Sequence, residues 1–443
     1  MKRREFLKAG AAALGGAAMS DKIASVMSGG GRAEAAVAGG KVAQPRFEAC
    51  LGPYNQKAMD VTMPQEVILC DVTLRDGEQT AGVAFSLEEK VDCARRLSNL
   101  GIPQIQIGRA DSAHGRKEAE TMCRLGLASK IEIMTAAGSK EWRSQVDAAL
   151  ACGADIVHSN IATSTYMRNM QGDIPESEVI KRLEEIVTYM RKRGAKIVNI
   201  SIMDATRTEE TFLLEVVRHM GHLGVDRFRI ADTVGTCTPE GIFYLITRVR
   251  ETLSAFPRPP IIGIHCHNDF GLVLANVFAA VKAGARLIDV TLNGLGERAG
   301  NPALVEVAVG LEALYGVDTK LQLGRLYEIS RYGEKISALP LPSNKPFVGE
   351  HACADQSDGH VKAYLDNPWA FEGIKPAVFG NRRKIIVGIK TGKNILEHKI
   401  RELKLNVTLD RYPQILERIR ALSLQNKGKV LTDADLIKII QQL

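Results

Sequence analysis

Between residues 67 and 314, short apolar runs alternate with longer amphipathic runs. This alternation limits the possible folds more than any other feature of the sequence. Runs rich in β-branched residues predict parallel strands, and an apolar period near 3.6 predicts helices. Eight units of a strand followed by a helix in about 250 residues are typical of a (β/α)8 TIM barrel, an α/β fold. We expect its strands near residues 67–73, 104–108, 131–136, 155–161, 196–202, 227–231, 261–267 and 287–292.

A doubly wound open sheet is the alternative fold. It is disfavoured because no Gly-x-Gly-x-x-Gly motif follows the first expected strand. After the barrel, which we place at residues 66–315, the segment 316–443 contains helical patterns separated by a stretch rich in Pro and Gly. This segment is expected to form a mainly helical lid or dimerisation region.

The first 38 residues have the features of an export signal. Arg3 and Arg4 precede a short apolar run that ends in small Ala-x-Ala triplets, as in a twin-arginine signal peptide. We therefore expect a periplasmic protein, with residues 39–65 as a linker. The alternative is a basic amphipathic N-terminal helix on a cytoplasmic protein. No apolar stretch reaches the length of about 18 residues that a transmembrane helix needs.

The net charge of +7 is concentrated in the N-terminal segment. Residues 1–46 contain eight Lys and Arg against three Asp and Glu, so most of the excess positive charge lies outside the expected barrel. A nucleic-acid-binding protein needs positive charge spread over its folded surface. The charge pattern therefore excludes nucleic acid as an expected partner, and we expect no membrane contact beyond export.

Polar side chains with catalytic potential follow the first and seventh expected strands. Arg75 and Asp76 follow the first strand and offer a cation for a developing oxyanion and a carboxylate for a metal. His265 and His267, two residues apart on the seventh strand, project to the same side. Asn301 lies in the Gly-rich loop after the eighth strand. Catalytic groups of TIM barrels gather at the C-terminal ends of the strands, so these residues are expected to meet there.

One carboxylate, two imidazoles and one amide oxygen are suitable ligands for a divalent cation. Mg, Mn, Co or Zn would each be compatible with Asp76, His265, His267 and Asn301, with positions left for water or substrate. Such a metal could chelate a 2-oxo acid and polarise it as a Lewis acid.

Residues 71–79, 265–269 and 294–301 resemble three signatures of the metal-dependent Claisen-type synthases and lyases. That family includes homocitrate synthase, 2-isopropylmalate synthase, citramalate synthase and hydroxymethylglutaryl-CoA lyase. Residues 231–235 and 344–349 are also similar to its motifs. The loop 294–301 is of the synthase type, and the overall length is most similar to the nitrogen-fixation type of homocitrate synthase.

The resemblance implies an acyltransferase that condenses acetyl-CoA with a 2-oxo acid, acting as a homodimer. It implies that Asp76, His265, His267 and Asn301 hold the metal and that Arg75 stabilises the enolate or alkoxide oxygen. Thr233 would hold the carboxylate of the 2-oxo acid. His360, in the C-terminal segment, would assist proton transfer. It would do so either in its own subunit or at the site of the other subunit of the dimer.

Three positions depart from the pattern of the family. Gln106 occupies a strand-two position that usually carries Glu, Met203 replaces the Glu of the fifth strand, and Met167 replaces a His after the fourth. A methionine can neither remove a proton from an acetyl group nor protonate a thioester.

These departures, together with the expected export away from cytoplasmic acyl-CoA, leave three hypotheses for the function. The first is the homocitrate synthase-like acyltransferase. The second is an exported metal-dependent lyase or aldolase that acts on a hydroxy- or oxo-acid without CoA. The third is a catalytically altered relative that binds a 2-oxo acid.

Overall fold

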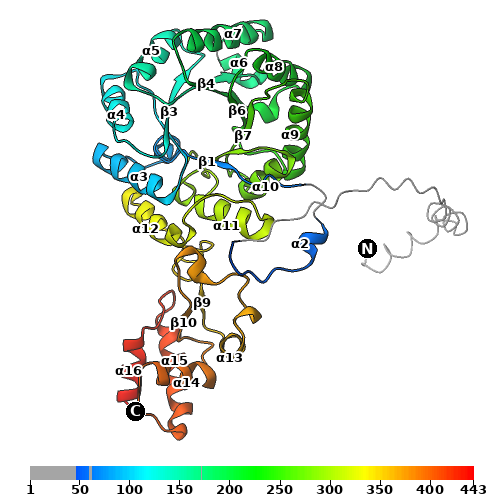
Figure 1. Ribbon diagram of the computed structural model, residues 1–443. Helices are drawn as coiled ribbons and strands as arrows, with labels where there is room; N and C mark the ends of the chain where they lie inside the picture. The colour runs from blue at the N-terminus through cyan, green and yellow to red at the C-terminus, as the bar shows by residue number, and fades with distance from the viewer. Residues whose placement is uncertain (1–45, 59–61, 171) are drawn as a thin grey trace, which may run out of the picture. The chain divides into compact units, whose positions relative to one another are not determined.

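A computed structural model describes residues 46–58, 62–170 and 172–443 of the chain. The expected export signal, residues 1–38, lies outside the described residues. Eight parallel strands close into a barrel in the order of the sequence (Figure 1). They are β1 (Ile68–Asp71), β2 (Gln104–Ile107), β3 (Lys130–Ala136), β4 (Ile156–Ala162), β5 (Ile197–Met203), β6 (Arg227–Asp232), β7 (Ile261–Cys266) and β8 (Leu287–Val290).

Helices follow the strands and surround the barrel (Figure 1). They are α3 (Leu87–Leu100), α4 (Ala113–Cys123), α5 (Trp142–Cys152), α6 (Thr165–Met170), α7 (Glu176–Lys192), α8 (Glu210–His222), α9 (Pro239–Leu253), α10 (Val273–Ala283) and α11 (Leu304–Tyr315). The predicted TIM barrel is therefore confirmed, and its strands begin and end within a few residues of the expected positions.

Local capping signals set where the helices begin and end. In α3, Ser86 and Glu89 form a capping box that satisfies free backbone N–H groups at the first turn. Gly101 ends the helix with φ of 105°, a left-handed conformation that glycine adopts without steric cost. In α9, Thr238 caps the first turn and Pro239 occupies a position where its missing N–H costs nothing.

The barrel is held by one large hydrophobic core between the strands and the surrounding helices. Cys70, Val72 and Leu287, at β1 and β8, form a small separate apolar cluster. The closing pair of strands joins β1 to β8, with Asp71 opposite Val290. This closure brings the residue after β1 close to the end of β7, which is the other neighbour of β8.

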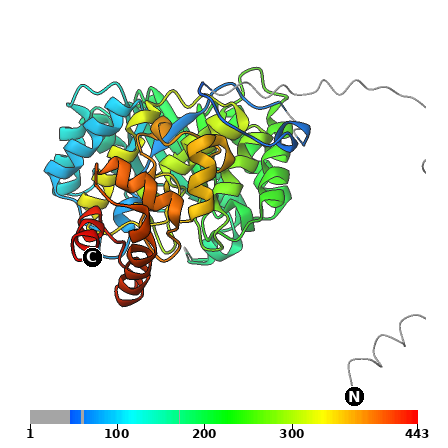
Figure 2. The same ribbon diagram turned by 90° about the horizontal axis from the view of Figure 1, so that it is seen from below.

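The C-terminal segment is mainly helical, as predicted. It contains α12 (Leu326–Ser337), α13 (Asp358–Asp366), α14 (Lys393–Glu402), α15 (Tyr412–Gln425) and α16 (Asp433–Gln441), with the short strands β9 (Ala354–Asp355) and β10 (Lys384–Ile385). From Val361 onward its helices pack around a second hydrophobic core (Figures 1 and 2). A role as a lid or in dimerisation stays a prediction.

One further helix, α2 (Tyr54–Lys57), precedes the barrel. In the part of the chain that the structure describes, no helix is both long and apolar enough to cross a bilayer.

Candidate metal centre

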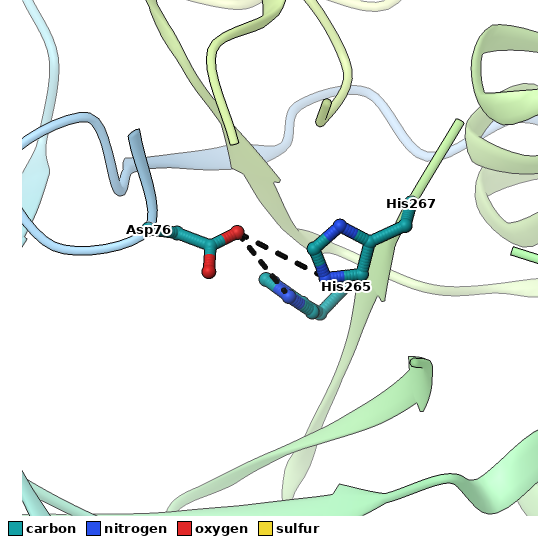
Figure 3. Close-up of side chains that lie close together, drawn as sticks. All are labelled: Asp76, His265 and His267. Carbon is teal, nitrogen blue, oxygen red and sulfur yellow. Dashed lines mark ion pairs between the residues drawn. The ribbon is translucent and has the colours of Figure 1, made fainter. Parts of the chain in front are cut away.

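Three buried side chains that can ligate a metal converge at the C-terminal ends of the strands. Asp76 follows β1, His265 lies in β7 and His267 follows it. Asp76 Oδ2 is 3.8 Å from His265 Nε2 and 4.0 Å from His267 Nε2. Figure 3 shows the carboxylate pointing toward both imidazoles. One ligand atom from each residue lies within 4.8 Å of the others, so the three can hold a metal ion together.

The electrostatic surroundings keep Asp76 and His267 in the protonation states that metal ligation requires. Burial disfavours a charged carboxylate, but Arg75 and the two imidazoles lower the pKa of Asp76 to about 2. Burial and the neighbouring His265 lower the pKa of His267 to about 4. At neutral pH the carboxylate is therefore ionised and His267 is neutral.

The structure brings Asn301 to the same centre. Its amide Nδ2 donates hydrogen bonds to Asp76 Oδ2 and to the Leu295 carbonyl, while its buried Oδ1 has no partner among the described residues. Gly296, with φ of 157°, permits this approach, since a Cβ there would lie 2.1 Å from Asn301 Nδ2. An unpaired buried oxygen is costly, so Asn301 Oδ1 is available to a ligand.

Arg75 lies at the rim of the centre. Its Nη1 is 2.6 Å from Asp76 Oδ1, and its Nε donates to Gln106 Oε1 at 2.6 Å. Its side chain is 14% exposed, so it is not wholly enclosed by the protein. A fixed cation in this position is suited to stabilising negative charge on a substrate oxygen.

The two remaining residues of the predicted site differ in position. Thr233 follows β6, where its Oγ1 accepts a hydrogen bond from the Asp204 backbone N–H at 2.8 Å. His360 lies in α13, half exposed, stacked on Phe371 with ring centroids 4.1 Å apart and 3.3 Å from Asp355 Oδ2. No contact in the described structure joins His360 to the metal centre, so its predicted part in proton transfer stays a prediction.

The departures from the family pattern lie in and around the barrel interior. Gln106 is wholly buried in β2, where it accepts from Arg75 and contacts Glu132 and His158. Met203 ends β5 and Met167 lies in α6, and both are half-buried. Gln106 therefore orients Arg75, and neither methionine offers a titratable group.

Sequence reasoning missed a group of charged residues inside the barrel. Glu132 of β3 binds Arg229 of β6 at 2.9 Å, and Arg229 also binds Asp289 of β8 at 2.7 Å. Burial alone would raise the pKa values of both carboxyls, but the Arg229 guanidinium holds them below their usual range. The missed signal was polar residues at alternate positions of otherwise apolar strands, which mark the inward face of the barrel.

Comparison with known proteins agrees with the fold. A model of the HMGL-like family matches residues 66–332, and a homocitrate synthase post-HMGL domain-like model matches residues 347–427. The 2-isopropylmalate synthase of Methanocaldococcus jannaschii is 38% identical over 394 residues, 88% of this chain and 74% of that protein. The homocitrate synthase AksA of Methanopyrus kandleri is 38% identical over 393 residues, 88% of this chain and 96% of that protein.

Solved structures show the same fold. The HMG-CoA lyase of Bacillus subtilis superposes with a TM-score of 0.55 at 19% identity, covering 63% of this chain and 96% of the lyase chain. At that identity the likeness concerns the fold alone. The family models and the relatives of similar length together establish that this chain belongs to the HMGL-like family and carries a homocitrate synthase post-HMGL region after its barrel.

Proposed function

We propose that this protein condenses acetyl-CoA with a 2-oxo acid at a divalent metal ion. The observation that carries the proposal is the convergence of Asp76, His265 and His267 beside Arg75 at the mouth of the barrel. The relatives named as 2-isopropylmalate, citramalate and homocitrate synthases support this class of reaction. No observation of the structure favours a lyase or aldolase that acts without CoA.

The residues present fit a divalent metal. The donor set contains one ionised carboxylate and two imidazoles, and Asn301 Oδ1 is a buried acceptor without a partner in the described structure. When bound, the metal supplies a Lewis acid for the keto and carboxylate oxygens of the 2-oxo acid. Mg, Mn, Co and Zn are all compatible with mixed oxygen and nitrogen ligands.

The residues of the chain then bind the substrates and move protons. Arg75 donates toward the substrate oxygen that becomes negative, and Thr233, which follows β6, binds the carboxylate of the 2-oxo acid. Gln106 and Met203 cannot accept a proton, so another group must remove the acetyl proton. His158 is the candidate for this step: burial lowers its pKa, its Nδ1 is 2.9 Å from Glu132 Oε1, and its Nε2 is 2.8 Å from the Ser201 hydroxyl.

The test is an assay with acetyl-CoA, a divalent metal and a panel of 2-oxo acids, in which the released CoA thiol is detected. The panel includes pyruvate, 2-oxoisovalerate and 2-oxoglutarate, the acids obtained by removing the acetyl unit from citramalate, 2-isopropylmalate and homocitrate. We expect thiol release that depends on both the metal and one of these acids. No thiol release with any acid would contradict the proposal.

A pair of histidine variants ties the activity to the site. His265→Ala should abolish thiol release and stoichiometric metal binding. His219→Ala is the matched control, because His219 lies on α8, part exposed and 3.1 Å from Glu184, away from the described centre. Equal loss of activity in both variants would show that the effect does not arise at the metal centre.

A further inference from the structure

The buried Arg229 links the two sides of the site through the interior of the barrel. Its Nε donates to Asp289 Oδ1 at 2.7 Å, and its Nη1 donates to Glu132 Oε1 at 2.9 Å. The side chains of Arg229, Glu132 and Asp289 are at most 1% exposed. A buried guanidinium needs carboxylate partners, because an unpaired charge there would strongly destabilise the folded protein.

A glycine of β7 makes room for this arginine. A Cβ at Gly263 would lie 3.1 Å from Arg229 Cγ, 3.2 Å from Leu287 Cβ and 3.0 Å from the Phe228 carbonyl oxygen. These separations are tighter than ordinary van der Waals contact. The absence of a side chain at this position therefore lets Arg229 cross the interior toward Asp289.

Asp289 stands between Arg229 and a residue of the metal centre. Its Oδ2 is 2.9 Å from His265 Nδ1, while His265 Nε2 faces Asp76. A guanidinium can only donate and a carboxylate can only accept. In the neutral imidazole the hydrogen must therefore lie on Nδ1, which leaves a lone pair on Nε2, the nitrogen that faces the centre.

We propose that Asp289, held in place by Arg229, is a positioning residue that keeps His265 in the tautomer able to bind the metal. The proposal rests on the metal centre of the proposed function and not on the identity of the acceptor acid. His267 provides the contrast inside the same site, because its buried Nδ1 has no partner in the described residues. The tautomer of His267 is therefore not set by a neighbour in this way.

Arg229 is also connected, through Glu132 and Gln106, to Arg75. Glu132 accepts from Gln106 Nε2, and Gln106 Oε1 accepts from Arg75 Nε at 2.6 Å. Arg75 then contacts Asp76. One buried cation therefore orients both a metal-ligating histidine and the arginine at the rim of the site, as outer-shell partners do in metal centres.

The test is Asp289→Asn, which preserves shape but replaces one acceptor atom by a donor. Arg229 can only donate, so the amide oxygen should turn toward it and the amide nitrogen toward His265 Nδ1. His265 would then carry its hydrogen on Nε2.

Histidine nitrogen NMR of the metal-free protein, recorded at a pH well above the ordinary imidazole pKa of about 6.5, should show this change of tautomer. The His265 signals are assigned by their loss in His265→Ala. Titration with Zn²⁺ or Co²⁺ should show a Kd weakened about 10- to 100-fold.

The matched control is Asp71→Asn. Asp71 is also a wholly buried aspartate of a barrel strand. Its Oδ1 accepts from the Thr73 N–H, and in the described structure no hydrogen bond or ion pair joins it to Asp76, His265 or His267. This variant should leave the His265 tautomer and the metal Kd unchanged.

Two results would overturn the proposal. One is the Nε2–H tautomer of His265 in the unaltered protein, observed for the signals that His265→Ala loses. The other is an unchanged metal Kd in a folded Asp289→Asn protein. Failure of the acetyl-CoA condensation is a separate result, since neither the spectrum nor the titration contains acetyl-CoA.

Discussion

At the scale of single residues, Asp71 makes the stability of the barrel depend on pH. It is wholly buried in β1, and burial, together with the nearby charge of Asp289, raises its pKa to about 7. The folded state therefore holds the proton more tightly than the unfolded chain, in which the pKa is about 3.9. The stabilisation is fully present below about pH 4 and is lost as the pH rises through about 7.

Asp71→Asn removes this titration. Compared with the unaltered protein, the variant should gain stability between about pH 4 and pH 8, by an amount on the order of 4 kcal/mol if the full shift is realised. Denaturant unfolding of both proteins at several pH values measures the difference. Parallel pH profiles for the two proteins would contradict the assignment.

Arg75 contributes through geometry as well as charge. Two nitrogens of its guanidinium make separate hydrogen bonds, Nε to Gln106 and Nη1 to Asp76, at 2.6 Å each. The single ammonium group of lysine cannot reproduce this pair of contacts. We expect Arg75→Lys to lower kcat of the condensation by about 10²- to 10³-fold while the metal remains bound. Arg109→Lys, at a half-exposed arginine paired with Asp111, is the control and should retain kcat. A fall of similar size in both variants would refute the role of Arg75.

At the scale of elements, the loop from Gly294 to Asn301 places the Asn301 side chain beside Asp76 in the candidate metal centre. A side chain at Gly300 would clash with the loop itself, since a Cβ there would lie 2.0 Å from the Gly294 carbonyl oxygen. The loop therefore has a conformation that only glycine allows, and Asn301 reaches Asp76 because of it.

Gly296→Ala should displace Asn301 and weaken metal binding by about tenfold or more. Calorimetric titration with a divalent metal measures the effect. Gly224→Ala is the control, because Gly224 also has a positive φ, of 64°, but has open space where a Cβ would lie. If the two variants bind metal equally well, the loop does not position a ligand.

At the scale of the whole molecule, the export signal stays a prediction and bears directly on the proposed reaction. Acetyl-CoA is a cytoplasmic metabolite, so an exported condensing enzyme would be separated from it. We expect the precursor to accumulate in the cytoplasm of a strain that lacks twin-arginine transport. Cell fractionation and detection of the protein in each fraction test this. Equal periplasmic amounts in strains with and without the transporter would show that residues 1–38 are not a twin-arginine signal.

The sequence by itself determined the number, order and approximate bounds of the barrel strands, and it predicted that Asp76, His265 and His267 lie together. This is because hydrophobic periodicity and capping are local: Ser86 and Gly101, which flank α3 in the sequence, also cap it in the structure. The Asp76, His265 and His267 cluster could be predicted because TIM barrels gather such residues at one end of the strands.

Only the tertiary structure decided what lies beneath that centre. Arg229 meets Glu132, 97 residues away in the chain, and Asp289, 60 residues away. Each of these charges is tolerable inside the barrel only because the others are there, and no local pattern encodes such a pairing. The place of His360, stacked on Phe371 in α13, likewise depends on how distant segments pack, which a motif match does not determine.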